Sequence, residues 1–369
     1  MKNVLVIFGG ESCEHDVSVI TGVMTLNAID RKIYNPIAVY VSKNGRWYTG
    51  ESLRDVSVFK NINVNKLSEV ALFCGDNNLY CVKKGKVKAV CEVYSAVNCC
   101  HGGEGEGGGL YSVLALSKIP CTSAEEFASS SSMDKEFTKL ALNGIGVSCL
   151  PCVKITDQGF YLRREEVLQL VKSKFDFPVI IKPSRLGSSI GIKIAKDEIE
   201  LEKGILQALA YDRKVVIESA LTNFREINCA VRKVGGVVEA SECEEPQLKT
   251  DFLTFEDKYK GETEKKFPAE IDKSISDQIK QIAKTVYKRL GFSGVIRIDF
   301  LLCEDKIYVN EINSVPGSLA YYLFCKSTED FAKFITELIE ESVDDKKATS
   351  QKITTFESGV LNLSSCKTK

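Results

Sequence analysis

The stretch FPVIIKPSRLGSSIGIKIAK, residues 177–196, places a lysine inside a β-branched apolar run and follows it with a loop of glycine and serine. Residues 179–181 predict a buried strand, and the isoleucines of 190–194 predict the return strand of a hairpin. Lys182, at the end of the buried run, is costly to bury unless its ammonium group meets an anion. The loop at 185–189 offers backbone N–H groups and two hydroxyls, which suit a phosphate. An ordinary hairpin turn with a lysine that reaches solvent is the alternative.

Length and composition predict a globular protein of two or three domains. The chain has 369 residues, 44% apolar and 27% charged, as is typical of soluble globular proteins. A net charge of −1 argues against nucleic acid and against an anionic membrane as partners. The start, MKNVLVIFGG, is a short apolar strand without a signal-peptide cleavage site, and no apolar run reaches 18 residues. We therefore expect a cytoplasmic location.

The cysteines do not predict a disulfide framework. There are fourteen of them, but they are scattered, and the chain is long and carries no secretory signal. The CxxC spacing at 149–152 has no second pair for a zinc site. We expect reduced thiols.

Strand and helix patterns alternate over residues 1–120. A strand that ends at Gly9-Gly10, a helix at 17–29 and a strand at 35–41 predict a βαβ start. A dehydrogenase reading of the Gly-Gly turn is the alternative, although the GxGxxG spacing is missing.

Later segments are also read from pattern. Helices are predicted at 129–142, 271–290 and 330–343. The polar stretch 250–268 predicts a long loop, of a length that is usually functional or disordered. Residues 344–369 predict a polar tail.

Two polar pairs interrupt an apolar hairpin near the carboxyl end, within VIRIDFLLCEDKIYVNEIN. Arg297 and Asp299 are two residues apart on one predicted strand, and Glu311 and Asn313 are two apart on the next, so each pair shares a face. Carboxylate and amide oxygens without histidine suit Mg²⁺ or Mn²⁺. An exposed hairpin with an Arg297–Glu311 salt bridge is the alternative. The chain has no Walker motif, so any nucleotide site is of another type.

Seven stretches follow one another along the chain: GGESCEHDVS (9–18), HGGEGEGG (101–108), MDKEFTK (133–139), FPVIIKPSRLGSSIGI (177–192), IES and FREIN (217–228), DKY (257–259) and GVIRIDF to NEINSVPG (294–317). Together, in this order, they resemble the D-alanine–D-alanine ligases of the ATP-grasp superfamily. The resemblance implies an α/β (α+β) ATP-grasp fold with an N-terminal Rossmann-like domain. The expected parts are 1–122, 123–218, 219–345 and a tail at 346–369.

The resemblance also implies the reaction and its cofactors. ATP phosphorylates the carboxylate of a first D-alanine, and the amine of a second D-alanine displaces the phosphate to give a dipeptide for peptidoglycan precursors. The expected ATP-binding residues are Lys135, Lys182, Ser189, Glu218, Glu226 and Lys258. Asp299, Glu311 and Asn313 match the ligands of two Mg²⁺ (or Mn²⁺) ions, which neutralise charge that develops on phosphate.

Substrate and catalytic positions follow in the same way. Glu14 matches the carboxylate that holds the first ammonium group, linked to Ser188 and Tyr259, while Lys258 reaches the γ-phosphate. Arg297 matches the residue that steadies the transition state and the second carboxylate. A tyrosine at position 259 goes with an amine nucleophile, hence a dipeptide. His101 fits a position near the first substrate, and a buried histidine bonded to backbone is the alternative.

Two departures from the family pattern bear on the second substrate. Gly107 follows Glu106 where the family usually has aspartate. After Gly317, a substrate position, Tyr322 replaces a serine that binds the second carboxylate. We therefore weigh a D-alanine–D-alanine ligase against a sibling ligase with another second substrate, and against a nucleotide-binding regulator without chemistry. The intact metal set argues against the regulator. The expected partners are D-alanine, ATP and a second copy in a homodimer.

Overall fold

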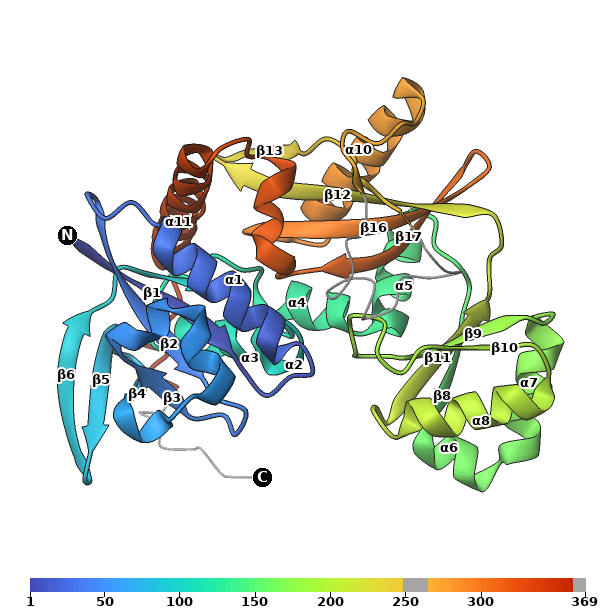
Figure 1. Ribbon diagram of the computed structural model, residues 1–369, viewed down its shortest axis with the longest axis horizontal. Helices are drawn as coiled ribbons and strands as arrows, with labels where there is room; N and C mark the ends of the chain where they lie inside the picture. The colour runs from blue at the N-terminus through green and yellow to red at the C-terminus, as the bar shows by residue number, and fades with distance from the viewer. Residues whose placement is uncertain (248–264, 361–369) are drawn as a thin grey trace.

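The first sheet is a seven-stranded sheet that opens with a βαβ unit (Figure 1). The structure is a computed structural model that describes residues 1–247 and 265–360. The sheet order is β6-β5-β4-β3-β2-β1-β7. Its strands are β1 (Lys2–Gly9), β2 (Tyr34–Val41), β3 (Trp47–Thr49), β4 (Ser68–Ala71), β5 (Asn78–Lys83), β6 (Lys86–Glu92) and β7 (Ser95–Asn98). β1 pairs in parallel with β2 and β7, and α1 (His15–Ala28) makes the crossover, which confirms the predicted βαβ start.

Short helices complete the first part of the chain. They are η1 (Glu51–Arg54), η2 (Val56–Asn61), η3 (Val64–Lys66), α2 (Gly103–Glu106) and α3 (Gly109–Leu116). The glycine-dense loop after β7 thus contains a helical turn.

The second sheet holds the hairpin around Lys182. Its order is β10-β9-β11-β8, and its strands are β8 (Val153–Thr156), β9 (Val179–Pro183), β10 (Lys193–Ala195) and β11 (Lys214–Ser219). Helices α6 (Asp157–Leu162), α7 (Arg164–Lys174) and α8 (Glu198–Leu209) accompany it. The hairpin is confirmed, but its return strand begins later than predicted. Gly191, within the predicted strand, lies in a turn with a positive φ of 75°, and this left-handed backbone cannot continue an extended strand.

The third sheet carries the predicted carboxylate strands. Its order is β13-β12-β16-β17, with β12 (Phe224–Val234), β13 (Val237–Ala240), β16 (Val295–Cys303) and β17 (Lys306–Asn313). Helix α10 (Lys273–Arg289) buries its apolar stripe against one face, together with the alternate residues Ile296, Ile298 and Phe300. The opposite face is left for polar side chains. A small ribbon of β14 (Glu245–Pro246) and β15 (Lys265–Lys266) adjoins it.

The helix expected at 129–142 is wrong as a single element. The structure has α4 (Glu126–Met133) and α5 (Lys135–Gly144), with Asp134 between them. The Asp134 carboxylate accepts hydrogen bonds from the backbone N–H groups of Glu136 and Phe137. An aspartate in this geometry begins a helix, so the break was encoded locally.

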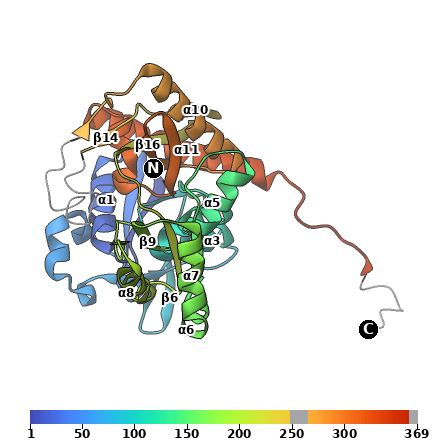
Figure 2. The ribbon, with the colours of Figure 1, turned by 90° about the vertical axis from the view of Figure 1, so that its right-hand side faces the viewer.

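The C-terminal helix α11 (Thr328–Ser350) extends further than predicted and packs back on the first sheet. Phe331, Phe334 and Leu338 share a core with Val4 and Val6, so α11 lies beside the first sheet (Figure 1). Helix η4 (Gly317–Leu323) precedes it. After Ser350 the chain leaves the body as an extended segment (Figure 2). Over residues 1–247 and 265–360 no helix has the length and apolar character needed to cross a membrane.

Candidate active site

Two adjoining cavities lie where the second and third sheets approach α1 and α5. A cavity of about 90 Å³ has walls from β9, β11 and β16 and contains Lys135, Lys182 and Glu218. A larger cavity of about 290 Å³ reaches from α1 to η4. Glu226 and Glu311 line both, so the cavities form one continuous site.

Lys182 does meet an anion, and the anion belongs to the protein. Its Nζ lies 3.0 Å from Oε2 of Glu218 on the neighbouring strand and 3.2 Å from Oδ1 of Asn310. Lys139 binds the other Glu218 oxygen at 3.0 Å. Burial opposes ionisation of Glu218, but Lys182 and Lys139 outweigh it and lower the pKa of this carboxyl. The net charge of this buried trio is positive, which suits a further anion.

Lys135 is held against the glycine–serine loop at residues 185–189. Its Nζ donates to the backbone oxygen of Leu186 at 2.7 Å. Burial lowers the pKa of its ammonium group, and nearby Lys182 adds to this while Glu311 opposes it. Two lysines therefore reach the smaller cavity from different elements.

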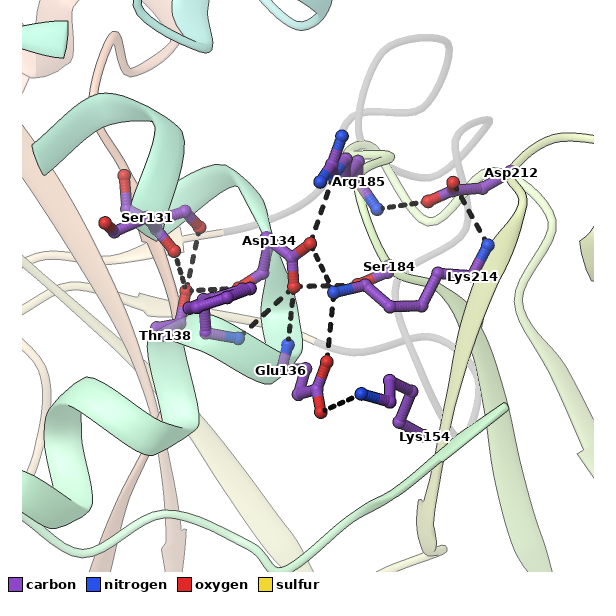
Figure 3. Close-up of polar contacts among 11 residues, drawn as sticks. Ser131, Asp134, Glu136, Thr138, Lys154, Ser184, Arg185, Asp212 and Lys214 are labelled. Carbon is purple, nitrogen blue, oxygen red and sulfur yellow. Dashed lines mark hydrogen bonds and ion pairs between the residues drawn. The ribbon is translucent and has the colours of Figure 1, made fainter. Parts of the chain in front are cut away.

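A polar cluster around Asp134 fixes the start of α5 and the end of β9 (Figure 3). Besides capping α5, the Asp134 carboxylate accepts hydrogen bonds from Ser184 (3.1 Å) and Arg185 (3.0 Å) and pairs with Lys214 (2.5 Å). Burial opposes its ionisation, but the bonds from Lys214 and Arg185 lower its pKa. This cluster ties Lys135 to the loop that follows Lys182.

The glycine–serine loop touches Glu14, which directly precedes α1. Ser188 Oγ donates a hydrogen bond to the Glu14 carboxylate. A Cβ at Gly187 would come within 2.8 Å of that carboxylate, and one at Gly102 within 2.7 Å. A side chain at either position would therefore displace the Glu14 carboxylate from its place beside the loop. The predicted Glu14–Ser188 contact is present.

The carboxylate strands have the predicted register. Asp299 pairs with Glu311 and Arg297 with Asn313 across β16 and β17, so the four side chains share one face of the sheet. The alternative of an exposed Arg297–Glu311 hairpin is wrong. Arg297 instead donates to both oxygens of Asp299 at 2.7 and 2.8 Å, and Asp299 is buried. Burial opposes the charge on Arg297, but Asp299 raises its pKa above the usual range.

His101 is a buried histidine bonded to the backbone, which was the alternative stated for it. It is buried, its Nδ1 bonds the Val315 carbonyl oxygen and its Nε2 bonds the Thr21 hydroxyl, each at 2.8 Å. It also lines the larger cavity. Burial lowers its pKa to about 4, so the ring is neutral near pH 7.

Tyr322 and Gly317 line the larger cavity, as do Glu14, Ser188 and Arg297, while Ser189 lines the smaller one. Lys258 and Tyr259 lie outside the described residues.

Sequence reasoning missed several polar residues of the site. They include Lys139, Asn228, Glu106, Glu244 and Lys265. Glu106 receives hydrogen bonds from the backbone N–H groups of Gly102 and Val315, and burial followed by the Glu14 charge raises its pKa to about 8. Lys139 lies four residues after Lys135, one helical turn on, and that spacing was the available signal.

In the described ranges no group of three His, Cys, Asp or Glu side chains is close enough to hold an ion. Asp299, Glu311 and Asn313 supply two carboxylates and an amide, and such hard oxygen donors suit Mg²⁺ when phosphate oxygens complete the shell.

The site and the two sheets that enclose it define the class of protein. A cavity that is lined by lysines and lies between two antiparallel sheets, in a chain that begins with a βαβ unit, is the ATP-grasp arrangement. The crystal structure of the D-alanine–D-alanine ligase from Helicobacter pylori superposes with a TM-score of 0.77 at 29% identity, and the match covers 92% of this chain and 98% of that one. A D-Ala:D-Ser ligase, VanG from Enterococcus faecalis, superposes with a TM-score of 0.75 at 25% identity, covering 94% and 99%.

Sequence comparison gives the particular family. The model of the D-ala D-ala ligase N-terminus matches residues 3–124, and that of the C-terminus matches residues 141–343. The D-alanine–D-alanine ligase of Thermosipho melanesiensis is 37% identical over 98% of this chain and 99% of its own length. That of Staphylococcus epidermidis is 31% identical over 95% and 99%. The chain belongs to the D-alanine–D-alanine ligase family.

Proposed function

We propose that the chain joins two D-alanines to D-alanyl-D-alanine at the expense of ATP, for peptidoglycan precursor synthesis. The observation that carries this is the position of Glu311, which lines the same cavity as Lys135 and Lys182 and pairs across the strands with buried Asp299. Acyl phosphate formation brings two anions together, so cationic groups on one side and a cation-binding carboxylate row on the other suit it.

The smaller cavity fits ATP. Ile180, Ile192 and Leu301 give it apolar walls, and Lys135 and Lys182 give it positive charge, which suits a base at one end and phosphates at the other. Glu218, Glu226 and Ser189 are assigned to the same ligand, and Lys258 to its γ-phosphate.

Asp299, Glu311 and Asn313 would hold two Mg²⁺ or Mn²⁺ ions, which would supply positive charge against the negative charge that develops on phosphate. Arg297 and Asn313 both donate to Asp299 here (2.7–3.2 Å). Cation binding at Asp299 therefore competes with these donors.

The chain's own residues orient the two amino acids. Glu14, fixed by Ser188 and assigned to a network with Tyr259, would hold the first ammonium group. His101, neutral and bonded to Thr21 and Val315, would bound that subsite without adding charge. Arg297 would face the carboxylate of the second substrate and the charge that develops in the transition state. Gly317 and Tyr322 would form the walls of the second-substrate subsite.

A sibling ligase with another second substrate is the second candidate. Tyr322 favours this second candidate, because its ring lies in the cavity wall and its hydroxyl points to Glu244 at 3.5 Å. The likeness to a D-Ala:D-Ser ligase also favours it.

The experiment is phosphate release from ATP with Mg²⁺, with products identified by mass. D-Alanine alone is compared with D-alanine plus a panel of D-serine, D-lactate and L-amino acids. D-Alanyl-D-alanine as the main product supports the first candidate. A product that joins D-alanine to a compound of the panel, with no product from D-alanine alone, would support the second candidate. Lys182→Met should abolish turnover, whereas Lys172→Met, which removes a lysine paired with Glu198 at the surface, should not.

We also propose three domains at 1–122, 123–218 and 219–345, each with one of the three larger sheets. The tail expected at 346–369 begins later, because α11 continues to Ser350. A cytoplasmic homodimer is proposed from the family resemblance, and exposed Phe127, Phe137 and Leu140 on neighbouring helices offer apolar surface for it. Light scattering tests the dimer.

A further inference from the structure

A buried carboxylate and a lysine, neither of them predicted from the sequence, lie in the wall of the larger cavity. Glu244 is 1% exposed, and its Oε1 pairs with Nζ of Lys265 at 3.2 Å. Its Oε2 accepts from Asn228 at 3.2 Å and faces the Tyr322 hydroxyl at 3.5 Å. All four side chains line this cavity.

The ammonium group of Lys265 is held in place but keeps donors for a ligand. It lies 4.5 Å from the centre of the Tyr322 ring, over its face, and Glu244 accepts one of its three N–H groups. Its side chain is 47% exposed. Two fixed contacts therefore orient a cation at the cavity wall while leaving it open to a bound anion.

The proposed reaction needs such a cation. The second amino acid carries a carboxylate, whose burial without a counter-charge is costly. Among the described residues that line the cavity, Arg297 and Lys265 are the cationic ones. Arg297 is already bonded to both oxygens of buried Asp299, so its charge is largely balanced.

We propose that Lys265 is a positioning and specificity residue that anchors the carboxylate of the second substrate, with Glu244 and Tyr322 fixing its ammonium group. This rests on the proposed ligase activity. Glu244 limits the positive charge, so the subsite accepts one carboxylate and disfavours substrates with a second.

Lys266 provides a matched control. It is the next residue of β15, and its Nζ binds Glu270 at 2.7 Å, away from the cavity. Adjacent strand residues point to opposite faces, so Lys266→Met removes the same charge from the same strand without touching the subsite.

The first test separates KM for the second D-alanine from kcat. Lys265→Met should raise that KM about 10- to 100-fold, the range expected when a hydrogen bond to a charged group is lost, and change kcat less than threefold. Lys265→Arg should restore most of the affinity, and Lys266→Met should match the wild type. If Lys265→Met leaves KM within twofold, the proposal is wrong.

The second test removes the carboxylate from the substrate instead. D-Alaninamide as second substrate should be used far less well than D-alanine by the wild type, and this preference should shrink at least tenfold in Lys265→Met. The double variant Lys265→Met/Glu244→Gln avoids an unpaired buried charge and should show the same shrinkage. An unchanged preference in both variants, with melting temperatures like the wild type, would overturn the proposal.

The two tests also separate this inference from the proposed function. A wild type that forms no dipeptide contradicts the ligase activity itself. A wild type that forms dipeptide, with a Lys265→Met variant that behaves identically, contradicts the anchor alone.

Discussion

Replacing Glu218 by glutamine should strongly destabilise the sheet that carries Lys182. The Glu218 side chain is 1% exposed and lies 3.0 Å from both Lys139 and Lys182, whose side chains are 6% and 9% exposed. At an effective dielectric constant near 20, each contact has a gross attraction of about 5 kcal/mol, which desolvation largely offsets. Removing one partner of a buried pair leaves uncompensated charge and typically costs about 3–5 kcal/mol. Here two lysines lose their counter-charge, so we expect that range.

The assay is the free energy of unfolding in urea, followed by circular dichroism, with amide hydrogen exchange of β9 and β11 as the local readout. Glu198→Gln is the matched control, because Glu198 pairs with Lys172 at 2.6 Å but is 42% exposed. Such surface pairs contribute about 0–1 kcal/mol.

Lys139→Met combined with Glu218→Gln should be less destabilised than Glu218→Gln alone, because one unpaired cation is removed with its partner. A loss below 1 kcal/mol for Glu218→Gln, equal to that of Glu198→Gln, would refute the reasoning. So would unchanged hydrogen exchange in β9 and β11.

Three further predictions concern the site. Asp299→Asn should lower kcat by at least two powers of ten, because it removes charge from the proposed cation site, and should also lower the melting temperature, because Arg297 loses its buried counter-charge; near-wild-type phosphate release would contradict the role in the site. Gly187→Ala should lower turnover at least tenfold, since its Cβ would lie 2.8 Å from the Glu14 carboxylate, whereas Gly144→Ala, with nothing within 4 Å, should not; equal turnover of the two variants would exclude the close approach. Burial lowers the pKa of His101 to about 4, so below about pH 6.5 the unfolded chain binds a proton that the folded chain does not, and stability falls as pH falls. Between pH 7.5 and pH 5 this group should cost about 2 kcal/mol of unfolding free energy, a loss that His101→Asn should remove in urea titrations; the same pH dependence in both proteins would show that His101 is not its source.

Local pattern was enough for most elements. The alternation of apolar and polar residues predicted β16 and β17, and with it the shared face of Arg297, Asp299, Glu311 and Asn313. The βαβ start and the hairpin after Phe177 were predicted in the same way. These patterns are readable because side-chain direction depends on neighbours two to four residues away. The break at Asp134 was also local, and was missed because helical periodicity continues across it.

Tertiary structure decided which side chains meet. Lys182 faces Glu218, Glu14 meets Ser188 across 174 residues, and Lys265 meets Glu244. Family resemblance predicted the second of these contacts, and residue spacing predicted none. Such contacts depend on the order of strands in each sheet and on how the sheets face one another. The sequence by itself thus determined the elements and the polar faces they present. The fold determined that a buried lysine has a protein carboxylate as its partner and that a second cation stands at the wall of the larger cavity, because packing between distant segments sets those distances.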